Sequence, residues 1–195
     1  MAETALTTER ILEAAEDVLR RFGPGKATVV DVARALGVSH GTVYRHFPSK
    51  AALRAAVTQR WLDRAHAGLP AVATGSQSPD VRLRRWLETL YEAKKRKALD
   101  DPELFATYQV LVDESSALID EHLTGLEAQL AVIIAEGQDD GIFAEVGDPL
   151  TLAHTVFQAT ARFHDPAYAS TWTTPTADQE FAALVGLLLR GLAAR

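Results

Sequence analysis

The sequence predicts an all-α protein built from nine helices. Patterns typical of β-strands are nearly absent from its 195 residues, whereas helix start signals recur along the whole chain. Apolar residues also recur at intervals of three and four, the spacing that gives a helix one apolar face. Because 47% of the residues are apolar and 24% are charged, we expect a globular chain with one large domain or two small ones.

The first predicted helix begins with a cap at Thr7 and ends at Gly23-Pro24-Gly25. Glu9 lies in its first turn, where a negative charge interacts favourably with the helix dipole. One face of this helix is apolar, and we expect that face to be buried: Ile11, Leu12, Ala15, Val18, Leu19 and Phe22.

Two short helices joined by a tight turn are predicted next. Thr28 and Asp31 have the spacing of a capping box, in which each residue caps the other at a helix start. Gly37 supplies the left-handed residue that ends the first of these helices. Ser39 caps the second, which runs roughly from His40 to Arg45. Two helices joined by a short turn containing glycine indicate a helix-turn-helix motif. Its second helix is short, has small residues near its start and has a polar outer face. Such a helix suits a DNA major groove.

The rest of the chain is predicted to continue as helices. A fourth helix opens at Ser49-Lys50 and ends before Gly68, and residues 70–78 are predicted to form a loop because they are small and flexible. Later helices are predicted to start at Ser78-Pro79-Asp80, at Asp101-Pro102-Glu103, at about Ser115, at Asp148-Pro149, and at Thr176, where Gln179 completes a capping box. The helix from about Ser115 to Glu136 is expected to bury Ile119, Leu123, Leu126, Leu130, Ile133 and Ile134.

Charge is distributed unevenly along the chain. The whole chain has a net charge of −6, but residues 1–66 carry +3 and the remaining residues carry −9. Within 24–66 there are seven Lys and Arg residues against two Asp and Glu residues. This asymmetry predicts a head that contacts DNA and an acidic body with another role.

The segment GVSHGTVYRHFPSK, residues 37–50, resembles the TetR family of one-component bacterial transcriptional regulators. The matching residues are Gly37, Val38, Ser39, Gly41, Thr42, Tyr44, Phe47 and Lys50. The resemblance covers roughly 45 residues in detail, and the nine-helix layout agrees with it over the whole chain. It implies a DNA-binding domain over 1–48 and a ligand-binding and dimerisation domain over 49–195, connected by the helix from 49 to about 67. It also implies a homodimer that pairs through its last two helices.

Nine residues are candidates for contact with DNA: Thr28, Ser39, His40, Gly41, Thr42, Tyr44, Arg45, His46 and Lys50. Gly41 lets the helix backbone approach the groove floor, and Thr42 offers a hydroxyl and a methyl group. Arg45 can reach a phosphate or a guanine edge. His40 either contacts a base or is an ordinary exposed histidine. Val43 and Phe47 are expected to pack inward instead.

The acidic body is expected to hold a small-molecule effector between its helices. The candidate residues are Trp86, Leu90, Phe105, Tyr108, Phe157 and Trp172 for an apolar wall, with His122, Gln158 and Arg162 as polar contacts. Plain core packing is the alternative for each aromatic residue. Arg162 is expected to contact the ligand, to lie exposed or to pair across a dimer interface.

The last two helices, about 149–164 and 176–193, are more apolar than a single surface helix requires. A four-helix bundle formed by two protomers would bury the surplus. Two-fold symmetry would then set the recognition helices about 34 Å apart on a palindromic operator.

No catalytic, cofactor or metal site is expected. The chain has no cysteine, its six histidines form no paired ligand set, and Gly23-Pro24-Gly25 lacks the context of a phosphate-binding loop. No signal peptide or membrane span is seen, so a cytoplasmic protein is expected. The basic run Lys94–Lys97 is interpreted as a solvated helix end, with a second DNA site as the alternative.

These observations favour a non-enzymatic, ligand-responsive repressor that binds double-stranded operator DNA as a homodimer. The alternative is a helical small-molecule-binding protein or enzyme in which the helix-turn-helix is only structural.

Overall fold

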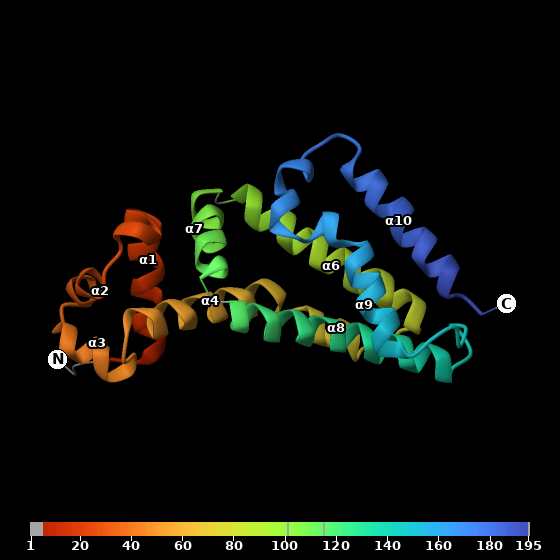
Figure 1. Ribbon diagram of the computed structural model, residues 1–195, viewed down its shortest axis with the longest axis horizontal. Coiled ribbons are helices and arrows are strands. Elements are labelled where there is room, and N and C mark those ends of the chain that lie inside the picture. Colours follow the sequence, from red (N-terminus) through yellow and green to blue (C-terminus); the bar gives the residue numbers. More distant parts are fainter. Residues whose placement is uncertain (1–5, 101, 115, 195) are drawn as a thin grey trace. The chain divides into compact units, whose positions relative to one another are not determined.

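The computed structural model describes residues 6–100, 102–114 and 116–194, and these residues are helical almost throughout (Figure 1). They form ten α-helices and two short 3-10 helices, and no strand occurs in these ranges, which confirms the all-α class. The chain divides into two compact units. The first contains Met1–Arg64 and Asp101–Ile119, and the second contains Ala65–Asp100 and Asp120–Arg195. The predicted domain boundary at residue 48 stays a prediction.

The first unit contains the helix-turn-helix. Its helices are α1 (Thr8–Lys26), α2 (Val29–Leu36), α3 (His40–His46), most of α4 (Lys50–His66) and α7 (Pro102–Asp113). In this unit α1 packs against α2 and against α7, and α2 packs against α3. The recognition helix α3 therefore packs against α2, and α2 packs against α1.

The predicted caps of the helix-turn-helix are confirmed. Thr28 and Asp31 form the reciprocal capping box at the start of α2, and the Thr42 backbone N–H donates to the Ser39 hydroxyl at the start of α3. Gly37 ends α2 with φ 68°, a conformation that costs a residue with a Cβ about 1 kcal/mol or more. Gly23, with φ 73°, breaks α1 near the predicted end, although the helical assignment continues to Lys26.

One predicted core position of the first unit is wrong. Phe22 is 42% exposed, and the Arg21 guanidinium lies over its ring, 5.2 Å from the centroid. Phe22 immediately precedes the Gly23 break, so the apolar stripe of α1 no longer faces α2 and α7 there. The other five residues of the predicted stripe are buried: Ile11, Leu12, Ala15, Val18 and Leu19.

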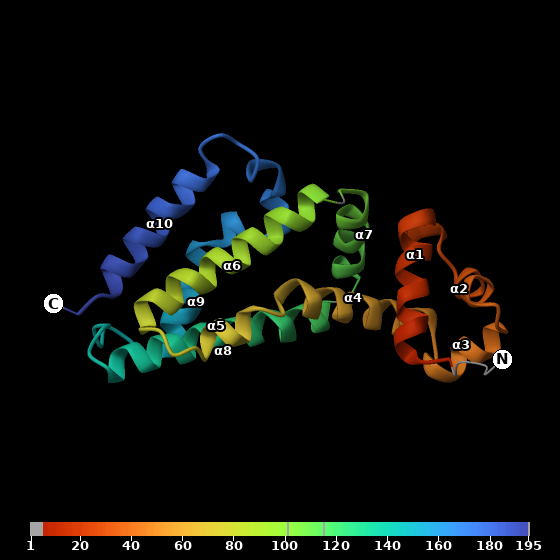
Figure 2. The same ribbon diagram turned by 180° about the vertical axis from the view of Figure 1, so that it is seen from behind.

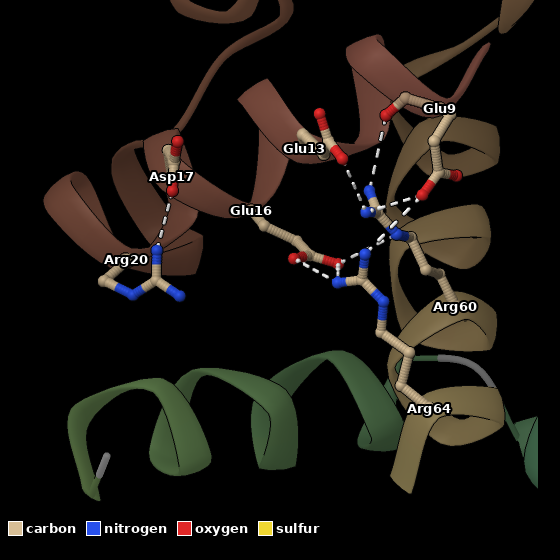
Figure 3. A network of polar contacts seen from close by, with 7 residues as sticks. All are labelled: Glu9, Glu13, Glu16, Asp17, Arg20, Arg60 and Arg64. Carbon is tan, nitrogen blue, oxygen red and sulfur yellow. Dashed lines mark hydrogen bonds and ion pairs between the residues drawn. The ribbon is translucent and has the colours of Figure 1, made fainter. Parts of the chain in front are cut away.

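A cluster of ion pairs joins α4 to α1 (Figure 3). The Arg60 guanidinium lies 2.7 Å from the Glu9 carboxylate and 3.3 Å from that of Glu13. The exposed Arg64 lies 3.2 Å from Glu16. Because the Arg60 side chain is only 7% exposed, these carboxylates compensate a charge that is otherwise removed from water.

The second unit contains α5 (Leu69–Ala73), α6 (Pro79–Asp100), most of α8 (Ser116–Asp139), α9 (Pro149–Ala159), the 3-10 helices η1 (Ala161–Phe163) and η2 (Pro166–Thr171), and α10 (Ala177–Leu192). α5 packs against α6 (Figure 2), as does α10. The core includes Leu83, Trp86, Leu130, Ile133 and Val185, all fully buried.

Four local predictions in the second unit are wrong. Residues 69–73 form the short helix α5 instead of a loop, because Leu69 and Ala73, one turn apart, are both buried. The helix predicted over 149–164 ends at Ala159 and gives way to η1. The Thr176 hydroxyl donates to the Glu180 carboxylate at 2.8 Å and caps no backbone N–H, so the capping box with Gln179 is absent. Leu123 was predicted to be buried but is 37% exposed. Helical periodicity shows which face of a helix a residue lies on, but it does not show whether another element packs there.

The loop after α8 holds the end of α10. Phe143 pairs with Ala193 in a single β-bridge, and the Ala144 N–H donates to the Leu192 carbonyl at 2.7 Å. The Phe143 ring lies against Gly137, where any Cβ would overlap it. This contact requires glycine at position 137.

Candidate nucleic-acid interface

The recognition helix α3 presents a polar face and buries an apolar one. His40, Gly41, Tyr44 and Arg45 are exposed. On the opposite side Val43 is fully buried and Phe47 is 8% exposed, which confirms that these two pack inward. The apolar side fixes α3 on its neighbours and leaves the polar side available to a ligand such as DNA.

Hydrogen bonds order the start of α3. The Ser39 and Thr42 hydroxyls lie 2.9 Å apart, and the Arg45 guanidinium donates to the Thr42 hydroxyl at 3.4 Å. The His40 and Tyr44 rings meet edge to face with centroids 6.3 Å apart. The candidate side chains are thus held together over the first two turns of the helix.

Three further candidates lie at the end of α3 or outside it, and all three are exposed. Thr28 donates its hydroxyl hydrogen to Asp31, and this bond lowers the pKa of the Asp31 carboxyl. His46 Nδ1 lies 3.5 Å from the Thr8 hydroxyl at the start of α1. Lys50 is the first residue of α4 and is exposed. Contact of any of the nine candidates with DNA stays a prediction.

The basic charge of this region is smaller than the sequence count suggests. No acid occurs between Asp31 and Asp63, yet four of the seven basic residues of 24–66 are used inside the protein. These four are Arg34 with Asp31, Arg54 with Glu114, and Arg60 and Arg64 with the acids of α1. Three exposed cations with no ion pair in the described ranges remain: Lys26, Arg45 and Lys50. Sequence counting missed the pairs of Arg54, Arg60 and Arg64 because their acids are distant in the chain.

Two protein-family models match the chain. The model described as bacterial regulatory proteins, tetR family, matches residues 11–57, and the one described as tetracyclin repressor-like, C-terminal domain, matches residues 79–185. The second match alone covers more than half of the chain. The chain belongs to the TetR family of bacterial transcriptional regulators. The resemblance seen in residues 37–50 is confirmed.

Similar sequences cover only part of this TetR-family chain. It is 36% identical over 78 residues to the HTH-type transcriptional regulator TtgR of Pseudomonas putida, a match that covers 40% of this chain and 35% of TtgR. It is 40% identical over 57 residues to an HTH-type transcriptional regulator of Mycobacterium tuberculosis, covering 29% of this chain and 28% of that relative. The matches therefore span about a third of these relatives.

Solved TetR-like structures match over nearly the whole chain. SmeT, the repressor of the Stenotrophomonas maltophilia multidrug efflux pump SmeDEF, is 17% identical with a TM-score of 0.72, and the match covers 97% of this chain and 92% of SmeT. The regulator FadR of Bacillus subtilis, solved in complex with stearoyl-CoA, is 21% identical with a TM-score of 0.65 and coverage of 96% and 98%. At these identities the matches show a shared fold.

The predicted effector residues of this TetR-family chain lie in both compact units. Trp86, Leu90, Phe157 and Trp172 are buried in the second unit, where the Trp86 indole donates to Gln129 at 3.0 Å and the Trp172 indole donates to the Arg162 carbonyl at 2.8 Å. Phe105 and Tyr108 are buried in the first unit instead. Only the first four therefore share one core.

The three predicted polar contacts are less enclosed. Gln158 and Arg162 are exposed, and the Arg162 guanidinium lies 2.9 Å from the Glu180 carboxylate. His122 is half-buried, and its ring stacks on that of His66 with centroids 4.7 Å apart. Of the alternatives for Arg162, this chain by itself shows an exposed ion pair.

One buried ionisable group in the second unit was missed. His164 is 7% exposed, and its Nε2–H donates to the Phe157 carbonyl at 3.0 Å. Burial lowers the pKa of His164 to about 4, so its ring is neutral at pH 7. Its place in the irregular segment after α9 gave no periodic signal.

In the parts of the chain described by the structure, no helix is both long and apolar enough to cross a membrane. Over the same residues, no group of three or more His, Cys, Asp or Glu side chains is arranged to hold a metal ion.

Proposed function

We propose that the protein is a cytoplasmic transcriptional repressor that binds a palindromic DNA operator as a homodimer and releases it when a small molecule binds. The polar, ordered and exposed face of α3 is the observation that carries this proposal. Such a face, on a short helix fixed by its apolar side, has the shape and chemistry of a major-groove reader. In this proposal the protein has no enzymatic activity.

The remaining charge supports phosphate binding. Lys26, Arg45 and Lys50 are exposed cations of the first unit that are not used in ion pairs within the described ranges. If each contacts one phosphate, a dimer neutralises about six phosphates, and log K should fall with log salt with a slope of about −5.

A gel-shift titration against the DNA that flanks its own gene tests the proposal. Lys50→Ala and Tyr44→Phe should each weaken binding, and Lys50→Ala should also reduce the salt slope by about 1 for each lysine in the complex. Arg96→Ala, an exposed basic residue of α6, is the matched control and should bind like the wild type. Equal losses in Lys50→Ala and Arg96→Ala, or binding that does not depend on salt, would contradict the proposal. The same titration separates the repressor from a protein whose helix-turn-helix is only structural.

Dimerisation through α9 and α10 is supported by the surface of α10. Ala183, Leu187 and Gly191, each four residues after the last, are exposed on one side of this helix, and Leu187 is 60% exposed. On α9, Leu150 is 58% exposed. Small residues around exposed leucines allow close contact with a second helix.

Sedimentation of Leu187→Glu measures this interface. The variant should sediment as a monomer at concentrations where the wild type is a dimer, because a buried carboxylate at the centre of the contact lacks a partner. Leu99→Glu changes an equally large, 50% exposed leucine on α6 and should leave the dimer intact. A dimeric Leu187→Glu would exclude this face.

The fold matches leave the effector open. FadR binds stearoyl-CoA in its structure, and SmeT represses a multidrug efflux pump. We therefore expect the effector of this protein to be an organic molecule with a substantial apolar part, bound in the second unit near Trp86, Phe157 and Trp172.

A further inference from the structure

A lysine continues the buried stripe of α6. Leu83, Leu87 and Leu90 form the buried stripe of this helix, each 2% exposed or less. The next inward positions are Tyr91, which is 4% exposed, and Lys94, four residues after Leu90. A residue four positions along a helix lies on the same face, so the Lys94 side chain starts from the face that carries the core.

The Lys94 ammonium has no partner in the described part of the chain: it takes part in no hydrogen bond and no ion pair. The next residue behaves differently, because the Lys95 ammonium lies 2.6 Å from the Asp178 carboxylate. Lys94 is half-buried, and burial lowers its pKa to about 8, while Asp165 raises it and Lys97 lowers it further. The basic run at the end of α6 is therefore not uniformly solvated.

Besides Lys97 on α6 itself, the ionisable groups near Lys94 come from the segment after α9. His164 is buried and its ring lies 4.2 Å from that of Phe157. Because His164 Nε2 donates to a carbonyl, Nδ1 carries a lone pair and the ring adds no positive charge. Asp165 is exposed. The surroundings thus provide one cation, one neutral imidazole and a single acid that remains in water.

Aromatic rings complete the surroundings of this segment. The ring of Phe163 meets that of Tyr91 at 5.5 Å and that of Phe181 at 5.2 Å, each edge to face. All three residues are buried. A ligand that reaches the Lys94 ammonium from this side therefore meets apolar surface along the rest of its length.

We propose that Lys94 is the anion-binding group of the effector site, and that the effector is a carboxylate carried on an apolar body. The Lys94 side chain is half-buried beside apolar residues, so a carboxylate that accepts hydrogen bonds from its ammonium interacts with it more strongly than in bulk water. The inference rests on the proposed ligand-responsive function. The proposed effector is an anion although the body carries a net negative charge. This is possible because a direct contact with Lys94 is stronger than the interaction with distant charges, which salt screens.

The buried arginine of this unit, Arg82, supports the choice of Lys94. Arg82 donates to the Ala73 carbonyl at 2.8 Å and pairs with Glu136, so its charge is already compensated inside the protein. Lys94 is the half-buried cation of the described second unit that retains its full capacity to donate.

Tryptophan fluorescence titrations of three proteins test the proposal: the wild type, Lys94→Met and Lys95→Met. The probes are benzoate, octanoate and dodecanoate, each beside its neutral primary amide. In the wild type at least one acid should bind about tenfold or more tightly than its amide, the advantage expected of a charge-assisted hydrogen bond. Lys94→Met should abolish that preference and keep the affinity for the amide. Lys95→Met, which removes an equal charge one residue away, should keep the preference.

Three results would overturn the proposal. They are equal binding of each acid and its amide by the wild type, an unchanged preference in Lys94→Met, and equal loss in both variants. Inorganic phosphate should not compete, because it lacks the apolar body, and competition by phosphate at equal concentration would also contradict it. The thermal midpoint of Lys94→Met without ligand should match or exceed that of the wild type, which shows that the variant folds.

DNA binding separates this inference from the proposed function. A protein that binds its operator but prefers no acid leaves the repressor standing and removes the role of Lys94. A protein that prefers the acid but binds no DNA keeps the site and removes the repressor.

Discussion

The rings of Trp61 on α4 and Tyr108 on α7 are stacked, with centroids 4.3 Å apart and planes inclined by 18°. Both side chains are buried. The stack places α7 in the compact unit that contains α3, although the C-terminal family model includes residues 102–113. A change in α7 therefore acts on α1 and α4, two helices of the unit that contains the recognition helix.

Replacing Tyr108 should test how much this stack stabilises the first unit. Tyr108→Ala should lower the free energy of unfolding by about 3–5 kcal/mol, the usual cost of deleting a buried aromatic ring. Tyr108→Phe keeps the ring and should cost less than about 1 kcal/mol. Urea denaturation followed by circular dichroism measures both. Similar midpoints for the two variants would show that the stack contributes little.

The two arginines of α4 should differ in their effect on stability. Arg60→Ala should cost about 2 kcal/mol, less than a fully buried pair, because Glu9 and Glu13 remain 60% and 57% exposed. Its third partner, Glu16, is only 13% exposed but keeps its pair with Arg64. Arg64→Ala removes a side chain that is 51% exposed and should cost about 1 kcal/mol at most. Chemical denaturation of the two variants gives the difference. If Arg64→Ala lowers the free energy of unfolding more than Arg60→Ala does, the burial of Arg60 does not determine its contribution to stability.

Glycines at positions 37 and 41 should separate stability from DNA binding. Gly37→Ala forces a Cβ into a left-handed conformation and should cost about 1 kcal/mol. At Gly41 a Cβ would lie 3.7 Å from the Ser39 hydroxyl, an ordinary contact, so Gly41→Ala should fold as well as the wild type or better. In the proposed docking of α3 this Cβ would lie between the helix backbone and the groove floor, so operator affinity should fall roughly tenfold. Thermal melts and gel shifts together decide; normal DNA binding by Gly41→Ala would contradict the docking of α3.

His164 should make the protein less stable below neutral pH. Its pKa is lowered from 6.5 to about 4, first by burial and further by Lys94, whereas the Phe157 carbonyl and Asp165 oppose this shift. Above pH 6.5 the ring is neutral in both the folded and the unfolded chain. As the pH falls towards 4, only the unfolded chain takes up the proton, so the free energy of unfolding drops by about 1.4 kcal/mol per pH unit.

The matching variant is His164→Gln. Between pH 7 and pH 5 the wild type should lose about 2 kcal/mol more than His164→Gln, as measured by urea denaturation at each pH. The difference between the two proteins is the readout, since carboxyl groups contribute equally to both. An identical loss in the two proteins would mean that His164 is protonated in the folded state.

Local signals in the sequence predicted the helix-turn-helix well. The capping box of Thr28 and Asp31, the left-handed Gly37 and the Ser39 cap depend on residues within four positions of one another, which a sequence displays directly. The burial of Val43 and Phe47 follows from the same short-range periodicity. These features, together with the family resemblance, were enough for the fold class.

Contacts between distant segments could not be predicted in this way. The pairing of Arg60 with Glu9 depends on how α4 crosses α1, and Tyr108 was assigned to a sensor pocket although it stacks on Trp61. The sequence of the run Lys94–Lys97 also does not show that Lys94 lacks an ion pair within the described residues. Tertiary packing determines which of the four adjacent cations lies next to a carboxylate. Thr176 shows the same limit at short range. A capping box with Gln179 was predicted, but the Thr176 hydroxyl donates to the neighbouring Glu180 instead.

The contact between Gly137 and the Phe143 ring has an evolutionary consequence. Because the ring fills the space of a Cβ, and because Phe143 also pairs with Ala193 at the end of α10, a side chain at position 137 displaces both. Among descendants of this sequence, a larger residue at 137 should be tolerated only with a smaller one at 143. The two positions are therefore expected to co-vary.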